Sequence, residues 1–400
     1  MVASDSLTAE ESPVDAMGLE LAEQTEVWRR LWDRRDQTAE VAEKALKGGL
    51  RRVVFTGCGD CHAAAEYAAS FLGLRSRLDV RAFPAMELSR FRPDLLTEDT
   101  LLVALSVSGR TPRVLEAVRA GDRRSAHPLA ITDNPEGPLV EDAEHRLFLE
   151  TSPPEALGRT DYRDPGAAEY SGYHRAVPQT KTFGAMQFAL ALLCLRLEGI
   201  EPSGQGSPPA EVEAALRSLP ELAPRAADAG LGAASLLAGV CRSRAFLSFC
   251  GSGLGYPAAR FAAYKLMELT RPAGFGDVEE YCHTLYLVTE AGDGVCFFAQ
   301  DDATLRRCRE IAPVVAEEIE AQPVVLSTAN SAVASPWEVS LPVVPPEVAP
   351  ILFGYAGAHL VRGIARSWGL NTDRFRAGVE EERYVRGSTR MIRKSKILDI

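Results

Sequence analysis

A short polar stretch, Ser106-Val107-Ser108-Gly109-Arg110-Thr111, has the composition of a phosphate-binding turn. It follows the apolar run Leu101 to Leu105, which predicts a buried strand, and it precedes a helical pattern that opens with Pro112. A proline in the first turn of a helix costs nothing, because the N–H that it lacks has no partner there. Hydroxyls and backbone N–H groups at the positive end of a helix bind phosphate. Serine-rich turns also cap helices without a ligand, so the motif alone leaves both interpretations open.

A carboxylate and an imidazole in the second half of the chain form a candidate pair for proton transfer. Glu268 lies in a helical pattern over 264–269, and His283 lies in the polar segment 279–284. A glutamate and a histidine are a usual pair for moving protons near neutral pH. A lone glutamate on a helix is normally solvated and a lone histidine is more often structural, so their spacing alone does not decide.

The segment Cys58-Gly59-Asp60-Cys61-His62 matches the attachment pattern of haem c. That chemistry belongs to exported proteins, and the N-terminal residues lack the basic and apolar regions of a signal peptide, so we reject haem. A zinc site is not expected either, because no second Cys/His pair lies at a suitable spacing. A redox dithiol remains an alternative, and we expect neither a metal nor a cofactor.

Two parts of the chain match one another without a gap, at a constant offset of 194 residues. In each copy a β-rich run enters a Gly-x-Gly turn and then an alanine-rich helix. The matched pairs are Phe55–Gly59 with Phe249–Gly253 and Ala64–Ala69 with Ala258–Ala263. At the same offset Ser106–Gly109 corresponds to Gln300–Ala303, so the second half has lost the anion-binding composition.

The two Gly-x-Gly turns fit a dinucleotide-binding loop poorly. His62 and Tyr256 stand where a third small residue would let the helix pack closely on the sheet. A nicotinamide oxidoreductase is therefore a minor alternative.

Strand-like and helix-like segments alternate after each copy, which predicts an α/β fold with two doubly wound, flavodoxin-like parallel sheets in tandem. The expected strands are 78–83, 101–105, 128–132 and 146–149 in the first half, and 284–289, 294–299, 323–327 and 339–344 in the second. The expected organisation is a tail and helical arm over 1–50, a first domain over 51–200, a linker and helix over 201–243, a second domain over 244–370 and a basic tail over 371–400.

The bulk composition excludes several classes of partner. A net charge of -11 argues against nucleic acid and against an anionic membrane surface. No apolar run approaches the length of a membrane span. The absence of a signal peptide and the scattered cysteines lead us to expect a cytoplasmic protein.

Taken together, these motifs resemble the sugar isomerase (SIS) domain family, in particular the double-SIS isomerase portion of glucosamine-6-phosphate synthase and its relatives. Any one motif is weak, but their shared order along the chain is specific. The segments that carry the resemblance are Met17–Gln24, Cys58–Cys61, Ser106–Thr111, Val177–Phe183, Glu268, His283 and Pro350–Tyr355.

The resemblance implies a role for each matching residue. His283 would protonate the ring oxygen and open the sugar, and Glu268 would then carry a proton between C1 and C2. In the family the histidine commonly comes from a neighbouring subunit, so a homodimer is implied. The residues that would hold the sugar phosphate are Gly57, Gly59, Asp60, Cys61, Ser106, Val107, Ser108, Thr111, Val177 and Gln179.

The chain departs from the family pattern at several places. Asp60 replaces a hydroxyl residue, and because a carboxylate beside a phosphate is unfavourable, we expect it to meet a sugar hydroxyl or an amine. The segment 373–378 has no lysine for Schiff-base chemistry, and a basic segment follows it. The stretch 151–176 is longer than the simple family loop and is interpreted equally as a specificity lid or a surface loop.

The sequence therefore predicts a phosphosugar isomerase that interconverts an aldose or amino-sugar phosphate with its ketose phosphate. A deaminase or deglycase that uses the same proton chemistry is a close alternative. A non-catalytic sugar-phosphate-binding protein is a further alternative, although a pure sensor would need neither Glu268 nor His283.

Overall fold

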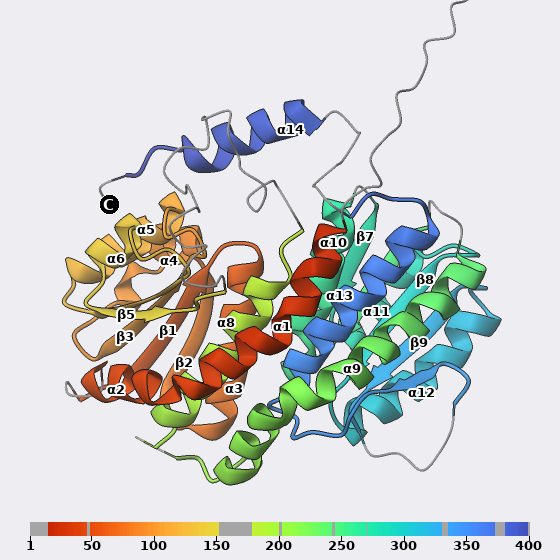
Figure 1. The fold of residues 1–400 in the computed structure, drawn as a ribbon, viewed down its shortest axis with the longest axis horizontal. Coiled ribbons are helices and arrows are strands. Elements are labelled where there is room, and N and C mark those ends of the chain that lie inside the picture. The colour runs from red at the N-terminus through yellow and green to blue at the C-terminus, as the bar shows by residue number, and fades with distance from the viewer. Residues whose placement is uncertain are drawn as a thin grey trace, which may run out of the picture.

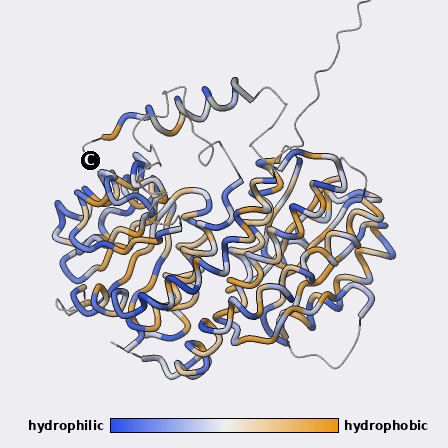
Figure 2. Tube along the Cα trace, in the orientation of Figure 1, coloured by the Kyte–Doolittle hydropathy of each residue, from blue (hydrophilic) through white to orange (hydrophobic). Residues whose placement is uncertain are grey.

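In a computed structural model of the chain, two α/β halves lie side by side, and the long helices α1, α9 and α13 cross diagonally between and over them (Figure 1). The structure describes residues 15–45, 49–151, 178–199, 202–241, 245–269, 271–329, 335–372 and 381–398. Hydrophobic residues line the inside of both halves (Figure 2). The main core is continuous from one sheet to the other, so the halves share one hydrophobic interior.

The first half contains a five-stranded parallel sheet with the strand order β2-β1-β3-β4-β5. Every residue of its third strand is buried, as expected of a strand with helices on both faces. Its strands are β1 (Arg52–Gly57), β2 (Asp79–Pro84), β3 (Thr100–Leu105), β4 (His127–Thr132) and β5 (His145–Phe148). Its helices are α3 (Asp60–Arg75), α4 (Ala85–Phe91), α5 (Pro112–Asp122), α6 (Pro138–Asp142) and α8 (Lys181–Leu197), with a 3-10 turn η2 (Pro93–Leu95).

The second half repeats this topology with the order β10-β9-β8-β6-β7, also fully parallel. Two doubly wound parallel sheets were predicted from the alternating pattern, and this prediction is confirmed. The strands are β6 (Leu247–Gly251), β7 (Ala273–Gly276), β8 (Gly294–Ala299), β9 (Gln322–Ser327) and β10 (Glu338–Ser340). The helices are α9 (Pro209–Val240), α10 (Tyr256–Glu268), α11 (Val278–His283), α12 (Asp302–Glu317) and α13 (Ala349–Ser367), with 3-10 turns η3 (Gly253–Gly255) and η4 (Leu285–Val288).

One predicted strand is wrong. Residues 284–289 do not form a strand, because they follow α11 and contain the turn η4. The apolar side chains that suggested a strand, Leu287 and Val288, are 69% and 58% exposed, so their pattern does not reflect burial in a sheet. The strand beside β6 is instead β7. Two of its four residues are glycines, so it lacks the β-branched residues by which a strand is predicted.

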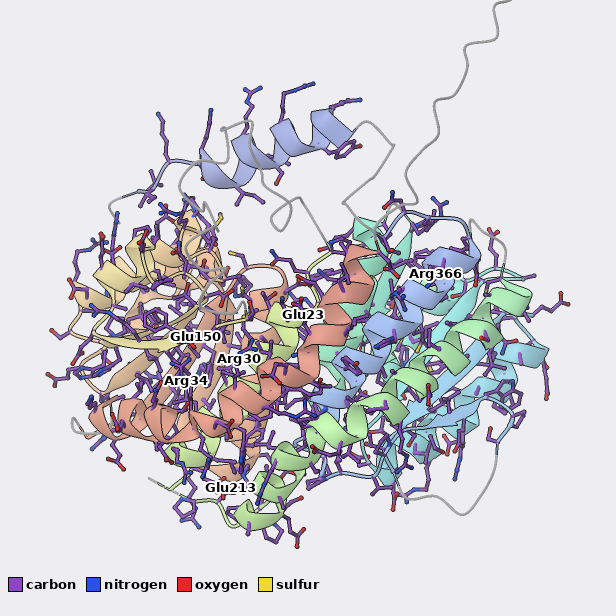
Figure 3. All side chains as sticks on the ribbon, viewed as in Figure 1. Glu23, Arg30, Arg34, Glu150, Glu213 and Arg366 are labelled. Carbon is purple, nitrogen blue, oxygen red and sulfur yellow. The ribbon has the colours of Figure 1, made fainter. Side chains whose placement is uncertain are left out.

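The predicted helical arm consists of α1 (Ala16–Asp33) and α2 (Arg35–Ala45). The Trp28 side chain of α1 donates to the carbonyl of Gly184 over 3.2 Å and lies 5.5 Å from the Tyr355 ring, centroid to centroid. Arg34 forms an ion pair with Glu150 just after β5, and both side chains are labelled in Figure 3. The arm therefore joins elements of both halves.

The basic C-terminal segment packs against the first half of its own chain. It contains α14 (Glu381–Ser388) and a π-helical turn η5 (Thr389–Arg393), and the C-terminal end lies close to α5 in Figure 1. The Leu398 backbone N–H donates to Glu116 Oε1 of α5 over 2.8 Å, and Arg113 donates to the carbonyl of Lys396. No helix within the described residues is long and apolar enough to span a membrane.

Candidate active site at the junction of the two halves

The polar stretch Ser106–Thr111 forms the turn from β3 into α5, at the carboxyl edge of the first sheet. Its hydroxyls face one another, with Ser106 Oγ 2.9 Å from Thr111 Oγ1. Gly109 adopts a φ of 62°, a left-handed conformation that favours glycine. The Asn134 side chain donates to the carbonyl of Ser108 over 2.9 Å and holds the turn from behind. The turn follows β3, which pairs with β1 at the point where the strand order reverses, and ligands of doubly wound sheets commonly bind at that point.

The turn from β1 into α3 lies directly beside it. Gly57 ends β1, and a Cβ there would lie 2.7 Å from the backbone carbon of Cys61, so the close approach of α3 requires glycine. The Cys61 thiol is within hydrogen-bonding reach of the Val107 backbone, which joins the two turns. Burial raises the pKa of Cys61 to about 12 and also raises the pKa of Cys58. Both thiols are therefore protonated at neutral pH, which argues against the redox dithiol.

A buried lysine links this edge of the first sheet to the second half. Lys265 of α10 has a side chain that is only 1% exposed. Its Nζ donates to Asp60 Oδ2 at the start of α3 and to Glu268 Oε1 at the end of α10, each over 2.8 Å. Although burial alone would lower the pKa of Lys265, the two carboxylates raise it above its usual value. We call Asp60, Lys265 and Glu268 the acidic–lysine cluster.

The packing of α3 against α10, which are equivalent helices of the repeat, determines the position of Glu268. α3 and α10 pack antiparallel, because Asp60 contacts Lys265 near one end while Glu66 pairs with Arg260 over 2.5 Å farther along. Glu66 and Arg260 are themselves equivalent positions at the offset of 194. The end of α10 is thereby placed at the start of α3, beside the carboxyl edge of the first sheet.

The two ends of this helix crossing differ in the polarity of their side chains, although the repeat makes them equivalent. The positions equivalent to Asp60, Lys265 and Glu268 in the other half are Leu254, Phe71 and Leu74. One end of the crossing therefore carries three ionisable groups and the other end carries three apolar side chains.

The surroundings of Glu268 favour its protonated form. Burial raises the pKa of this carboxyl to about 8; Lys265 opposes the shift, and the negative charges of Asp60 and Glu20 add to it. Lys265 Nζ lies 2.8 Å from both carboxyl oxygens, but only Oε1 has the geometry of a hydrogen-bond acceptor. Oε2 is buried and accepts no hydrogen bond from the described residues.

The loop before α8 lies near the same cluster. Glu20 of α1 accepts from the backbone N–H groups of Thr180 and Lys181, over 2.6 and 3.2 Å. Gln179 precedes this cap, and its Oε1 accepts from the Thr182 hydroxyl over 3.5 Å. Val177, and the predicted insertion except for its first residue, lie outside the described residues.

His283 is not part of this arrangement within one chain. It lies at the end of α11, 68% exposed, with Nε2 3.6 Å from Glu279 Oε1. Glu268 ends α10, and the start of α10, near α11, is roughly 18 Å away along the helix axis. The two predicted catalytic residues therefore occupy opposite edges of the second sheet.

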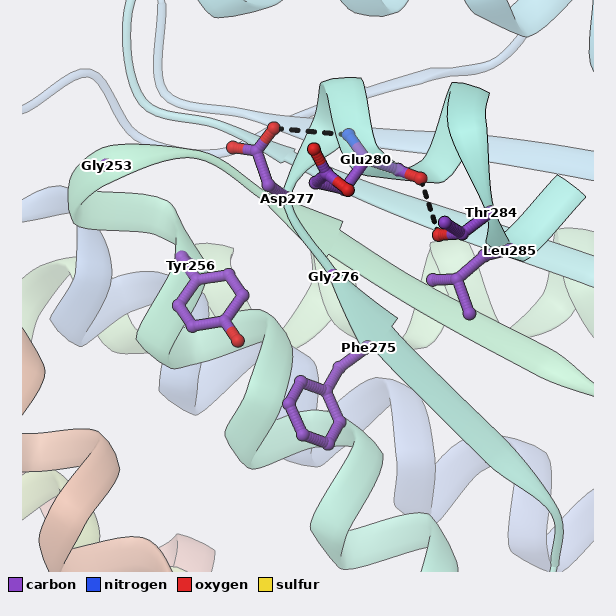
Figure 4. Close-up of a pocket in the computed structure, with 8 residues that line it drawn as sticks. All are labelled: Gly253, Tyr256, Phe275, Gly276, Asp277, Glu280, Thr284 and Leu285. Carbon is purple, nitrogen blue, oxygen red and sulfur yellow. Dashed lines mark hydrogen bonds between the residues drawn. The ribbon is translucent and has the colours of Figure 1, made fainter. Parts of the chain in front are cut away.

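A cavity of about 500 Å³ lies beside α11 at the carboxyl edge of the second sheet (Figure 4). The rings of Tyr256 and Phe275 form one side of it, and the carboxylates of Asp277 and Glu280 lie on the other. Two carboxylates disfavour a phosphate, which agrees with the loss of the serine-rich turn from the second half. Within the part of the chain that the structure describes, no group of three His, Cys, Asp or Glu side chains is arranged to hold a metal ion.

The sequence motifs missed Lys265 and Glu20. Lys265 sits one helical turn before Glu268, a spacing that puts both side chains on one face. That spacing was available in the sequence. The approach of Asp60 and Glu20 from other helices was not.

Comparison with known proteins identifies a domain in the first half of the chain and relatives of most of its length. A model of the SIS domain matches residues 50–162, so the chain contains a SIS domain in its first half. The chain is homologous to the isomerase portion of glutamine–fructose-6-phosphate aminotransferases. The enzyme of Halobacterium salinarum is 26% identical over 277 residues, which are 69% of this chain and 42% of that protein. The chain thus spans less than half the length of this curated relative.

Solved structures share the fold of nearly the whole chain. The C-terminal domain of glucosamine-fructose-6-phosphate aminotransferase from Francisella tularensis has a TM-score of 0.72 at 18% identity, covering 92% of this chain and 100% of that one. Tagatose-6-phosphate ketose/aldose isomerase from Escherichia coli has a TM-score of 0.65 at 18% identity, covering 89% and 96%. Glucosamine-6-phosphate deaminase from Thermotoga maritima has a TM-score of 0.61 at 17% identity, covering 90% and 96%.

Proposed function

We propose that this protein is a phosphosugar isomerase that moves a proton between C1 and C2 of an aldose or amino-sugar phosphate. The observation that carries the proposal is that Glu268 shares Lys265 with Asp60 at the start of α3, where the neighbouring Cys61 thiol reaches the Val107 backbone of the serine-rich turn. A carboxyl group beside a phosphate-binding turn can meet the reacting carbons of a sugar whose phosphate is held there. We place the reaction in the cytoplasm, with a small sugar phosphate as the partner and no nucleic acid.

In this proposal the phosphate is bound by Ser106, Ser108 and Thr111 at the start of α5, where the helix end favours an anion. Glu268, once ionised, removes the proton from C2 of the open-chain aldose and returns it to C1 of the enediol. The Lys265 ammonium, fixed beside Glu268, favours negative charge on the adjacent sugar oxygen as the enediol forms.

Ring opening requires a proton donor for the ring oxygen, and the proposed donor is His283 of a second subunit. His283 is exposed and is separated from Glu268 of its own chain, whereas the neighbouring Leu287 and Val288 present apolar surface. A symmetric homodimer that covers this surface would bring the histidine of one chain to the cluster of the other.

Deamination or deglycation is the second candidate, and Asp60 is the observation that favours it, because a carboxylate at this turn suits an amine. With an amino group at C2, removal of the C2 proton gives an enolamine, and protonation at C1 gives an imine. Water then adds to the imine and ammonia leaves. Glu268 performs the same proton transfer in both reactions.

The proposal is tested by Glu268→Gln, which keeps the size of the side chain but cannot accept the proton. We expect loss of solvent deuterium incorporation at C2 of glucose 6-phosphate and glucosamine 6-phosphate, followed by NMR, with binding of both compounds retained. Glu141→Gln, on α6 away from the cluster, serves as the control and is expected to exchange like the wild type. Undiminished exchange in Glu268→Gln would remove Glu268 from the mechanism, and binding without exchange in the wild type would favour the non-catalytic binding protein.

A further inference from the structure

We propose that Asp60 determines substrate specificity: its carboxylate selects a sugar phosphate that carries a protonated amine near the reacting carbons over one that carries only hydroxyls. This inference rests on the proposed function, because it places the reacting carbons beside Glu268.

Asp60 and Glu268 both lie on the open side of the buried lysine, because the Glu268 side chain is 26% exposed. Asp60 and Glu268 each accept from the same Lys265 Nζ over 2.8 Å, so their two oxygens lie within two hydrogen-bond lengths of one another. The Asp60 side chain is 22% exposed while Lys265 is almost fully enclosed. A sugar whose reacting carbons lie at Glu268 would therefore have a substituent within reach of the Asp60 carboxylate.

The charges of the acidic–lysine cluster are unequal. Two carboxylates share one ammonium, and an uncompensated negative charge is costly in a partly buried site. This imbalance is relieved in the free protein when Glu268 holds a proton, in agreement with the raised pKa of that group. Near neutral pH the free protein then has mostly protonated Glu268, which cannot act as a base.

A ligand ammonium would supply the missing positive charge. Placed beside Asp60, it would make a charge-assisted hydrogen bond and balance the two carboxylates, so Glu268 would release its proton on binding. A hydroxyl in the same place offers no charge, so the pKa of Glu268 would stay raised and proton transfer would be slower near neutral pH than with the amine. The selection would therefore act on both affinity and proton transfer.

The other charged groups around the cluster do not supply that charge. From α1, Glu20 adds a further negative charge and is engaged by the backbone N–H groups before α8. Arg260 lies five residues before Lys265 on α10. It forms an ion pair with Glu66 and donates to His62 Nδ1 over 2.8 Å. Burial and the nearby Arg260 lower the pKa of His62 to about 4, so this histidine is neutral near pH 7.

The test compares glucosamine 6-phosphate with glucose 6-phosphate, which differ in the amine or hydroxyl at C2. Calorimetry would measure both affinities for the wild type, Asp60→Asn and Asp60→Thr. We expect the wild type to bind the amino sugar about tenfold more tightly, the size of one charge-assisted hydrogen bond. In both variants this ratio of affinities should fall to about one. C2 exchange of glucose 6-phosphate should also extend to lower pH, because Lys265 and Glu268 then form a balanced ion pair and the pKa of Glu268 falls.

The matched control is Glu66→Gln, which removes another carboxylate that links α3 to α10 but leaves the acidic–lysine cluster intact. It should keep the preference for the amine, and its thermal unfolding would show that loss of a cross-helix ion pair alone is tolerated. Equal binding of the two phosphates by the wild type, or loss of preference in Glu66→Gln, would overturn the role of Asp60. Failure of the wild type to bind either phosphate would instead contradict the proposed function.

Discussion

At the scale of single residues, the chemistry of this site depends on neighbours more than on residue type. Glu268 is an ordinary glutamate in an amphipathic helix until burial raises its pKa to about 8, a shift that Lys265 opposes and the Asp60 charge increases. The two cysteines beside the site show the converse, because burial keeps their thiols protonated and unreactive at neutral pH. The same residue types on an open surface would have neither property.

The hydroxyls of the serine-rich turn are expected to recognise the phosphate and not the sugar. Replacing both Ser108 and Thr111 by alanine should weaken binding of a hexose phosphate roughly 100-fold, since each hydrogen bond to a charged group contributes about 1.5 kcal/mol or more. Binding of the unphosphorylated hexose should hardly change. Titration calorimetry of both ligands checks this, with Ser218→Ala on α9 as the control. Equal losses for the two ligands would refute the phosphate assignment.

At the scale of elements, the end of α3 opposite to the active site is fixed by a buried ionic network. Arg75 ends α3, and its Nη1 lies 2.8 Å from Glu347 Oε1 and donates to the Ser207 carbonyl over 2.7 Å. Arg75 also pairs with Glu198, just after α8. The ends of α3 and α8 are thus tied to the segments that precede α9 and α13, which holds the two halves in a fixed relation.

Arg75→Met should destabilise the protein strongly, because it leaves Glu198 and Glu347 buried without their cation. We expect a loss of about 3–5 kcal/mol in the free energy of unfolding, measured by urea denaturation. Arg81→Met breaks a solvent-exposed pair with Asp79 and should cost at most about 1 kcal/mol. Similar losses for the two variants would show that the buried network does not hold the halves together.

At the scale of the whole molecule, a single chain separates the two proposed catalytic residues. α10 runs from the carboxyl edge of the second sheet, near α11, to Glu268 at the acidic–lysine cluster. His283 remains at the other edge, beside exposed apolar residues. We therefore propose that His283 acts in another copy of the chain.

Subunit mixing tests this arrangement. Glu268→Gln and His283→Asn should each be inactive alone, because each homodimer lacks one group at both sites. Coexpression of the two variants should restore about a quarter of wild-type activity, since half of the dimers are mixed and one of their two sites is complete. Activity is followed by C2 exchange on the unfractionated coexpressed protein, and mixed dimers purified by two different tags should show about half of wild-type activity. Mixed dimers without activity would place both groups within one chain.

The sequence alone determined the local features of this protein. Strands and helices follow from short-range patterns of burial, so the alternating segments and the constant offset predicted two parallel sheets, which are confirmed. The serine-rich turn was predictable for the same reason, because its residues are contiguous between β3 and α5. The prediction failed at 284–289, where an apolar pattern lies on the surface and glycines conceal β7.

Only the tertiary structure decided what the residues of the two halves do together. The antiparallel crossing of α3 and α10 depends on packing between segments about 200 residues apart, which no local pattern encodes. That crossing places Lys265 between Asp60 and Glu268 and buries the lysine, with the two carboxylates only partly exposed, so the three charges interact more strongly than they would in water. The length of α10 separates Glu268 from His283. Glu268 lies at the end of this helix, and His283 lies near its start, at the carboxyl edge of the second sheet.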